Sequence, residues 1–161
     1  MSLLVLLLVV AAVVALNAPS ASFLPGFARL LANPRVEAGP LRFLWGQSSA
    51  TGRLGDRDVT IRLQLKRSRY GQGYLVVAMR ARVGETLNAS AIDTRVQDDS
   101  GRRALFTLAT RDVMLSVDDG WLAARWQPQG FVMFPGRFSG ARWRPVLDAM
   151  QRVAESLERA G

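Results

Sequence analysis

The sequence predicts an α+β fold: an N-terminal transmembrane helix, an antiparallel sheet of about five to seven strands, and a C-terminal amphipathic helix packed on one face of that sheet. Three observations predict it. The chain opens with a long stretch without charge, its middle holds strand-like alternation joined by Gly-containing turns, and its end carries an apolar stripe at helical spacing. We therefore expect an anchor over residues 1–24, a linker over 25–40 and a basic domain over 41–161.

The N-terminal stretch is apolar enough to enter a membrane. About 20 apolar residues are needed for a helix to cross a bilayer core, and residues 2–24 offer that length. A secretory signal peptide would also need a basic segment before the apolar core, and none is present, so we favour an uncleaved anchor. Its lipid-facing residues would be Leu3, Leu4, Val5, Leu6, Leu7, Leu8, Val9, Val10, Val13, Val14 and Leu16.

The charges that flank this stretch predict its orientation. Arg29, Arg35 and Arg42 follow it, against the single acid Glu37, and nothing basic precedes it. Because cationic flanks stay in the cytoplasm, we expect the N-terminus outside and the domain on the cytoplasmic side of a bacterial inner membrane. The alternative is a cleaved signal peptide and an exported, periplasmic domain.

Residues 25–40 are rich in proline and glycine and are expected to form the linker. Within them, residues 27–31 could make a short helical turn, with Phe27, Leu30 and Leu31 facing either lipid or the domain. A plain tether is the other interpretation of this stretch.

The first strands follow from alternation. Residues 41–45 are a short apolar run, and residues 51–54 and 57–66 then form a hairpin through Gly55-Asp56. In its second strand four apolar residues alternate with polar ones, which places them on one buried face. Residues 66–73 make a basic hairpin tip. Residues 74–83 return as a strand that is apolar on both faces in its first half, so we expect it to be central. The four alternating residues are Val59, Ile61, Leu63 and Leu65.

The second half of the domain is expected to be a helix, a hairpin and a closing helix. Residues 84–93 look irregular, and residues 102–109 favour a short helix over a strand. Residues 111–117 and 121–126 form a hairpin around Asp118-Asp119-Gly120, and residues 131–134 a further short strand. The closing helix starts near Pro145. Its apolar stripe consists of Val146, Met150, Val153 and Leu157.

The order of these last elements resembles a loose group of small uncharacterised bacterial proteins. The likeness covers roughly residues 102–160 and rests on the Asp-Asp-Gly turn and on Leu147, Ala154, Glu155 and Leu157 of the closing helix. The resemblance implies an N-terminal membrane helix and a compact α+β domain. It brings no catalytic residue with it.

The composition argues against several kinds of active site. The chain has no cysteine and no histidine, so it has no disulfide, no Cys or His metal site and no histidine base. The acid pairs Asp98-Asp99 and Asp118-Asp119 stand where turns favour Asp and Gly. We therefore predict a protein that is not an enzyme and that carries no cofactor and no metal.

Arginine and aromatic residues mark the expected interaction surface. Net charge is +8, and Lys66 is the sole lysine among 21 basic residues. One patch is the hairpin tip and the other precedes the closing helix; Trp45 and Trp126 are assigned to the core. Anionic lipid headgroups and acidic protein faces suit such patches, and a membrane tether makes nucleic acid unlikely as a partner. The residues are Lys66, Arg67, Arg69, Tyr70, Arg137, Arg142, Trp143 and Arg144.

Together these observations predict a membrane-anchored accessory or scaffold subunit of a larger membrane protein complex, with photosynthetic and respiratory assemblies as the classes of host considered. The alternative function is that of an exported domain that binds a ligand or an envelope component.

Overall fold

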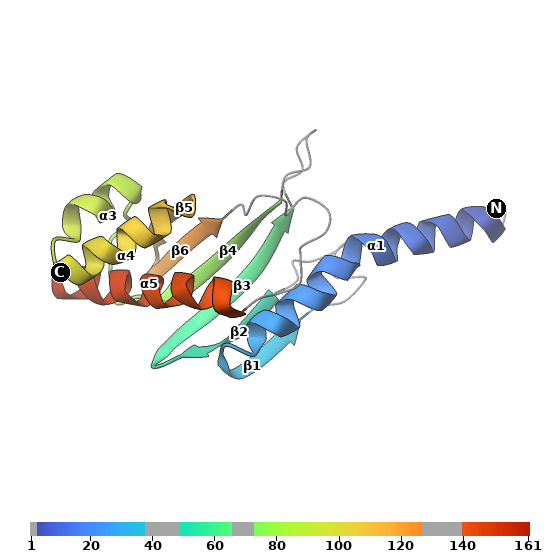
Figure 1. The fold of residues 1–161 in the computed structure, drawn as a ribbon, viewed down its shortest axis with the longest axis horizontal. Coiled ribbons are helices and arrows are strands. Elements are labelled where there is room, and N and C mark those ends of the chain that lie inside the picture. Colours follow the sequence, from blue (N-terminus) through green and yellow to red (C-terminus); the bar gives the residue numbers. More distant parts are fainter. Residues whose placement is uncertain (1–2, 38–48, 66–72, 127–139) are drawn as a thin grey trace.

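The computed structural model describes residues 3–37, 49–65, 73–126 and 140–161. It confirms the α+β class: an open antiparallel sheet of six strands, in the order β1-β2-β3-β4-β6-β5, carries helices on one face (Figure 1). The helices are α1 (Leu3–Ala28), α3 (Ala89–Arg95), α4 (Asp99–Ala109) and α5 (Gly140–Arg159). The strands are β1 (Ala32–Glu37), β2 (Ser49–Leu54), β3 (Arg57–Leu65), β4 (Gly73–Arg80), β5 (Val113–Asp118) and β6 (Trp121–Trp126).

The two hairpins predicted around Gly55-Asp56 and Asp118-Asp119-Gly120 are confirmed. In the first, Leu54 pairs with Arg57 across a two-residue turn in which Gly55 has φ 62°. In the second, Asp118 pairs with Trp121, and the turn residues Asp119 and Gly120 have φ values of 46° and 72°. Two positive φ angles in a row are the signature of a type I′ turn, which matches the twist of the flanking strands.

Strand β4 is central, as its sequence predicts, although it ends at Arg80 rather than at residue 83. Its neighbours are β3 and β6, so that Val77 lies between Ile61 and Ala124 in register. All three of these side chains are buried. On the opposite face Val76 and Ala78 are half-buried, and no described helix covers them.

The helices that follow β4 arise from local capping. The predicted helix over residues 102–109 is confirmed as α4, which begins earlier because the Asp98 side chain accepts a hydrogen bond from the Gly101 amide. Helix α3 was not expected. It starts where the Asn88 side chain accepts from the Ala91 amide, and it buries Ile92.

The closing helix is also confirmed, and it extends further toward the N-terminus than its stripe suggested. Pro145 lies inside α5 rather than at its first turn. All four residues of the stripe are buried against the sheet and its neighbouring helices: Val146, Met150, Val153 and Leu157.

The expected linker belongs in part to the folded body. Residues 25–28 end α1, and residues 32–37 form β1, which pairs with β2. Phe27 and Leu31 are buried and Leu30 packs against the same core, so these three side chains face the domain rather than lipid. The reason lies in the tertiary structure: soon after α1 ends, the chain forms β1, which pairs with the edge of β2. The predicted strands at 41–45 and 131–134 lie outside the described residues.

When only the residues that the structure describes are counted, no helix is both long enough and apolar enough to cross a membrane. The transmembrane helix expected over residues 1–24 is therefore not supported. Helix α1 instead has two regions of different exposure, and these define the candidate site.

Candidate functional site

The N-terminal part of α1 is an exposed apolar rod. Figure 1 shows it extending well beyond the sheet, with the N-terminus at the far tip. Eight consecutive aliphatic side chains, from Leu3 to Val10, are exposed, and their exposed fractions run from 44% for Val5 to 76% for Leu3. A soluble domain rarely leaves so large a contiguous apolar surface in water, which makes this rod the candidate interaction site.

This rod is apolar on every side. Residues 3–16 contain no polar side chain, whereas a helix that docks into the groove of a protein keeps a polar stripe toward solvent. A helix that is apolar all round suits an environment that is apolar all round. A lipid bilayer provides such an environment.

The other end of α1 is held firmly in the core. Leu24 and Phe27 are fully buried, and Ala28 and Leu31 nearly so. Leu31 packs closely on β2, because a Cβ added at Gly52 would lie 2.7 Å from the Leu31 Cβ atom. A residue larger than glycine at position 52 would push the end of α1 away from the sheet.

Three aromatic rings join α1 to the rest of the domain. Trp143 of α5 meets Phe27 with ring centroids 5.0 Å apart and an interplanar angle of 65°. It meets Trp126 of β6 at 4.2 Å and 66°. Edge-to-face contacts of this kind add to the stabilisation from burial. The C-terminal end of α1 is therefore held to the body by an aromatic cluster.

This cluster corrects the expected docking role of Trp143. Its exposed fraction is 3%, so its ring serves the core and is not offered to a partner. The assignment of Trp126 to the core is confirmed by its 5% exposure, and Trp45 lies outside the described residues. The three arginines near Trp143 in the sequence favour docking, but the aromatic partner that decides its position, Phe27, lies on α1.

The rest of the expected interaction surface is not assembled into one site by the described residues. Arg144 is exposed and pairs with Asp148 one helical turn away, at 3.4 Å. Arg142 lies in α5, and its side chain is not among those described. The other expected surface residues lie outside the described ranges: Lys66, Arg67, Arg69, Tyr70 and Arg137.

A cationic surface that the sequence analysis missed lies on the uncovered face of the sheet. Arg62, Val76 and Arg125 stand side by side in register on β3, β4 and β6. Both arginines are exposed, and neither has an acidic partner among the described residues. Four residues further along β4 and β6, the Arg80 guanidinium lies 5.3 Å from the centroid of Trp121. The alternation in β3 already placed Arg62 on this face; only the strand order brings Arg125 beside it.

Among the residues that the structure describes, the best-buried charged group is Arg57, and its role is structural. Its guanidinium donates to both carboxylate oxygens of Glu158, at 2.6 and 2.8 Å, and to the Arg80 carbonyl at 3.0 Å. Glu158 also accepts from the Arg82 amide at 2.7 Å. The hydrogen bonds from Arg57 lower the pKa of Glu158, and those to Glu158 raise the pKa of Arg57. The pair ties β3 and β4 to the end of α5.

A second polar contact joins α4 to α5. The Ser156 hydroxyl donates to the Asp98 carboxylate, and Arg159 lies 3.4 Å from the same group. The hydrogen bond from Ser156 is the main reason that the pKa of Asp98 is lowered. Asp98 thus begins a helix instead of closing the acidic turn that the sequence suggested. Because the same carboxylate also accepts from the Gly101 amide at the start of α4 and pairs with Arg159 of α5, we assign the contact to helix packing.

Comparison with protein-family models, with curated proteins and with solved structures finds no match for this chain. The resemblance of residues 102–160 to small bacterial proteins stays a prediction.

Proposed function

We propose that this protein is a non-enzymatic accessory or scaffold subunit that is held at a membrane by the exposed apolar part of α1. The single observation that carries the proposal is the row of aliphatic side chains from Leu3 to Val10, which is exposed in the isolated chain and apolar on every side.

The energy available from this rod is large enough for stable attachment. Transfer of a fully exposed aliphatic side chain out of water contributes about 1.5–3 kcal/mol. Eight partly exposed side chains therefore contribute on the order of 10 kcal/mol before the cost of immobilisation. Attachment of this strength does not require that the helix cross the bilayer.

The buried joint between α1 and the body determines what such an anchor would do. Because Leu24 and Phe27 are buried in the domain, the body follows the rod directly and stays next to the lipid surface. Confinement there raises the effective concentration of the body near other membrane proteins. Its exposed arginines, Arg62 and Arg125 among them, then meet acidic faces of neighbouring subunits or anionic headgroups. Photosynthetic and respiratory complexes are the host classes that we propose.

Vesicle flotation tests the attachment. The full chain, mixed with phosphatidylcholine vesicles and centrifuged in a density gradient, is expected to rise with the lipid. Replacing Leu4 and Leu8 by glutamate removes that behaviour, because each charge must leave water. The matched control is Phe106→Glu with Met114→Glu, which also changes two exposed apolar residues but lies on the body. Equal flotation of the Leu4 and Leu8 variant and the control would refute the proposal.

The role as a subunit needs a separate test. Detergent extraction of the untagged membrane protein, followed by native mass measurement, is expected to give a mass larger than that of one chain. A monomer of 17.7 kDa would contradict the role in a complex. It would not contradict the proposed membrane attachment.

A further inference from the structure

Strand β5 lies at one edge of the sheet, and part of that edge is already paired with another segment of the chain. Leu87 pairs with Val117 on the side away from β6: the Leu87 amide donates to the Val117 carbonyl at 2.9 Å, and the Val117 amide donates to the Leu87 carbonyl at 2.8 Å. The outer edge of β5 therefore accepts an extended segment in the folded protein itself.

The next two outward-facing residues on this edge are Val113 and Leu115. In an antiparallel ladder, alternate residues turn their backbone groups toward the same neighbour, so these two share the outward direction of Val117. Among the described residues neither has a backbone partner on that side. Their two amides and two carbonyls have the spacing of a β-ladder, so another extended chain can pair with them.

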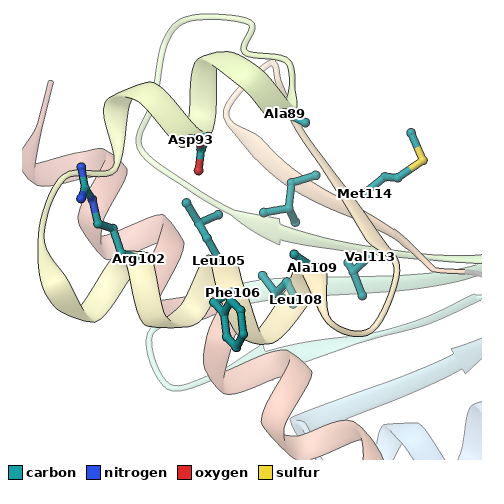
Figure 2. A pocket seen from close by; sticks show the side chains of 10 residues that line it. Ala89, Asp93, Arg102, Leu105, Phe106, Leu108, Ala109, Val113 and Met114 are labelled. Atoms are coloured by element: carbon teal, nitrogen blue, oxygen red, sulfur yellow. The ribbon is translucent and has the colours of Figure 1, made fainter.

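An apolar groove runs along the same edge. It has a volume of about 650 Å³ and lies between α3, α4 and β5 (Figure 2). Leu105 and Phe106 line it from α4, and Met114 lines it from β5. Phe106 and Met114 are 71% and 67% exposed, the highest values among the large apolar residues of the described body.

The opposite edge of the sheet, formed by β1, is protected against pairing. Of the two edge strands, β5 is therefore the one that can accept another strand. Strand β1 carries Pro34, which has no amide to donate, and its register shifts between Ala32 and Arg35. Asn33 there has a positive φ of 49°. Proline and bulges are the usual devices that stop an edge from pairing. Strand β5 pairs with β6 without a shift from Val113 to Asp118 and contains no proline.

The shape of the groove selects its occupant. A second copy of this chain, pairing through its own β5, would bring its own α3 and α4 to the same edge, where the first copy's helices already stand. A single extended segment brings no such bulk. Asp93 and Arg102 line the groove as well (Figure 2), and neither has an ion-pair partner among the described residues. The exposed Arg102 guanidinium favours a carboxylate on the incoming segment.

We infer that β5 and its groove bind an extended segment of another protein, one with apolar side chains at alternate positions and a carboxylate that reaches Arg102. The segment adds a strand beside Val113 and Leu115, and its apolar side chains pack on Leu105 and Phe106. This inference rests on the body of the protein and is independent of membrane attachment.

Amide hydrogen exchange of the full chain in detergent tests it, with a capped synthetic peptide as probe. The peptide alternates valine and threonine over four residues and carries a glutamate at one end. A second peptide has the same side chains but N-methylated amides at alternate positions. In the free protein the amides of Val113 and Leu115 are expected to exchange faster than that of Met114. With saturating peptide both should exchange about tenfold more slowly, and Met114 should not change.

The charge is tested by Arg102→Glu, with Arg103→Glu as the matched control on the same helix. Arg102→Glu is expected to weaken peptide binding about fivefold, and Arg103→Glu to leave it unchanged. Equal binding of the N-methylated peptide would overturn strand pairing, as would unchanged exchange at saturating peptide concentrations. Protection that appears without peptide and rises with protein concentration would identify a second copy as the occupant and overturn the assignment to another protein.

Discussion

At the scale of single residues, Arg57 shows what the sequence cannot reveal. Its partner Glu158 is 101 positions away, whereas the acids beside it in the sequence, Asp56 and Asp58, are exposed turn neighbours. Alternation predicted the strand around Arg57 correctly. It could not predict that the first residue of that strand would lie under the end of α5, because this depends on how the sheet and helix pack.

Glu158→Gln is expected to destabilise the fold by on the order of 3 kcal/mol, because it leaves the buried Arg57 charge without its counter-charge. Urea unfolding measures the loss. The pair Arg57→Met with Glu158→Leu is the control, since removing both charges should cost less than removing one. A double variant that is less stable than Glu158→Gln would contradict this account.

The lowered pKa of Glu158 predicts a pH dependence. The unfolded chain binds a proton at Glu158 at a higher pH than the folded chain does, so the pair contributes its full stability above the ordinary carboxyl pKa of about 4.3. That contribution falls as the pH drops through the lower, folded pKa. Melting temperatures from pH 7 to pH 3 should therefore decline more steeply in the native chain than in Glu158→Gln. Equal declines in melting temperature in the two proteins would show that other ionisable groups determine the pH dependence of stability.

Gly101 is a second residue whose role depends on a contact with α5, far away in the sequence. Alanine in a helix is usually favoured over glycine by about 1 kcal/mol, and Gly101 lies in α4. Here the added Cβ would contact Val96 and the Ser156 side chain at less than van der Waals distance. Gly101→Ala should therefore lower the melting temperature, against the intrinsic preference. Ser100→Ala, at an exposed neighbouring position, should not.

At the scale of elements, the strands and helices with their own signals were predictable. The hairpins at Gly55 and Gly120 and the stripe of α5 appear in the sequence because turn geometry and burial select residue types locally. Strand β1 has no such signal, and the local signal of α3 is limited to its cap residue, Asn88. All six residues of β1 are exposed, so no alternation marks it, and its existence depends on pairing with β2. The anchoring end of α1 was missed because Pro25 and Gly26 looked like a linker.

The joint between α1 and the body predicts the effect of Trp143→Ala. Loss of a buried tryptophan costs about 3–5 kcal/mol, and here it also removes the ring that holds Phe27. Trypsin should then cleave faster at Arg29, which is exposed just after α1. Trp121→Ala is the matched control, because Trp121 is half-buried on the uncovered face of the sheet. Equal cleavage rates in the two variants would argue against the aromatic joint.

At the scale of the whole molecule, the apolar rod and the arginine-rich body predict on which side of a membrane the body lies. Arg29 follows α1 directly and Arg35 lies in β1, and such residues close to a membrane-inserted segment favour the cytoplasmic side. The chain has no cysteine, so a single introduced cysteine gives an unambiguous labelling signal. In intact spheroplasts a membrane-impermeant maleimide should not label Arg103→Cys until the cells are lysed. Leu3→Cys, at the first residue of α1, reports on the tip of the rod: labelling before lysis shows a helix that crosses, as the sequence predicts, and labelling only after lysis shows one that enters without crossing. Immediate labelling of Arg103→Cys would place the body outside and favour the exported domain instead.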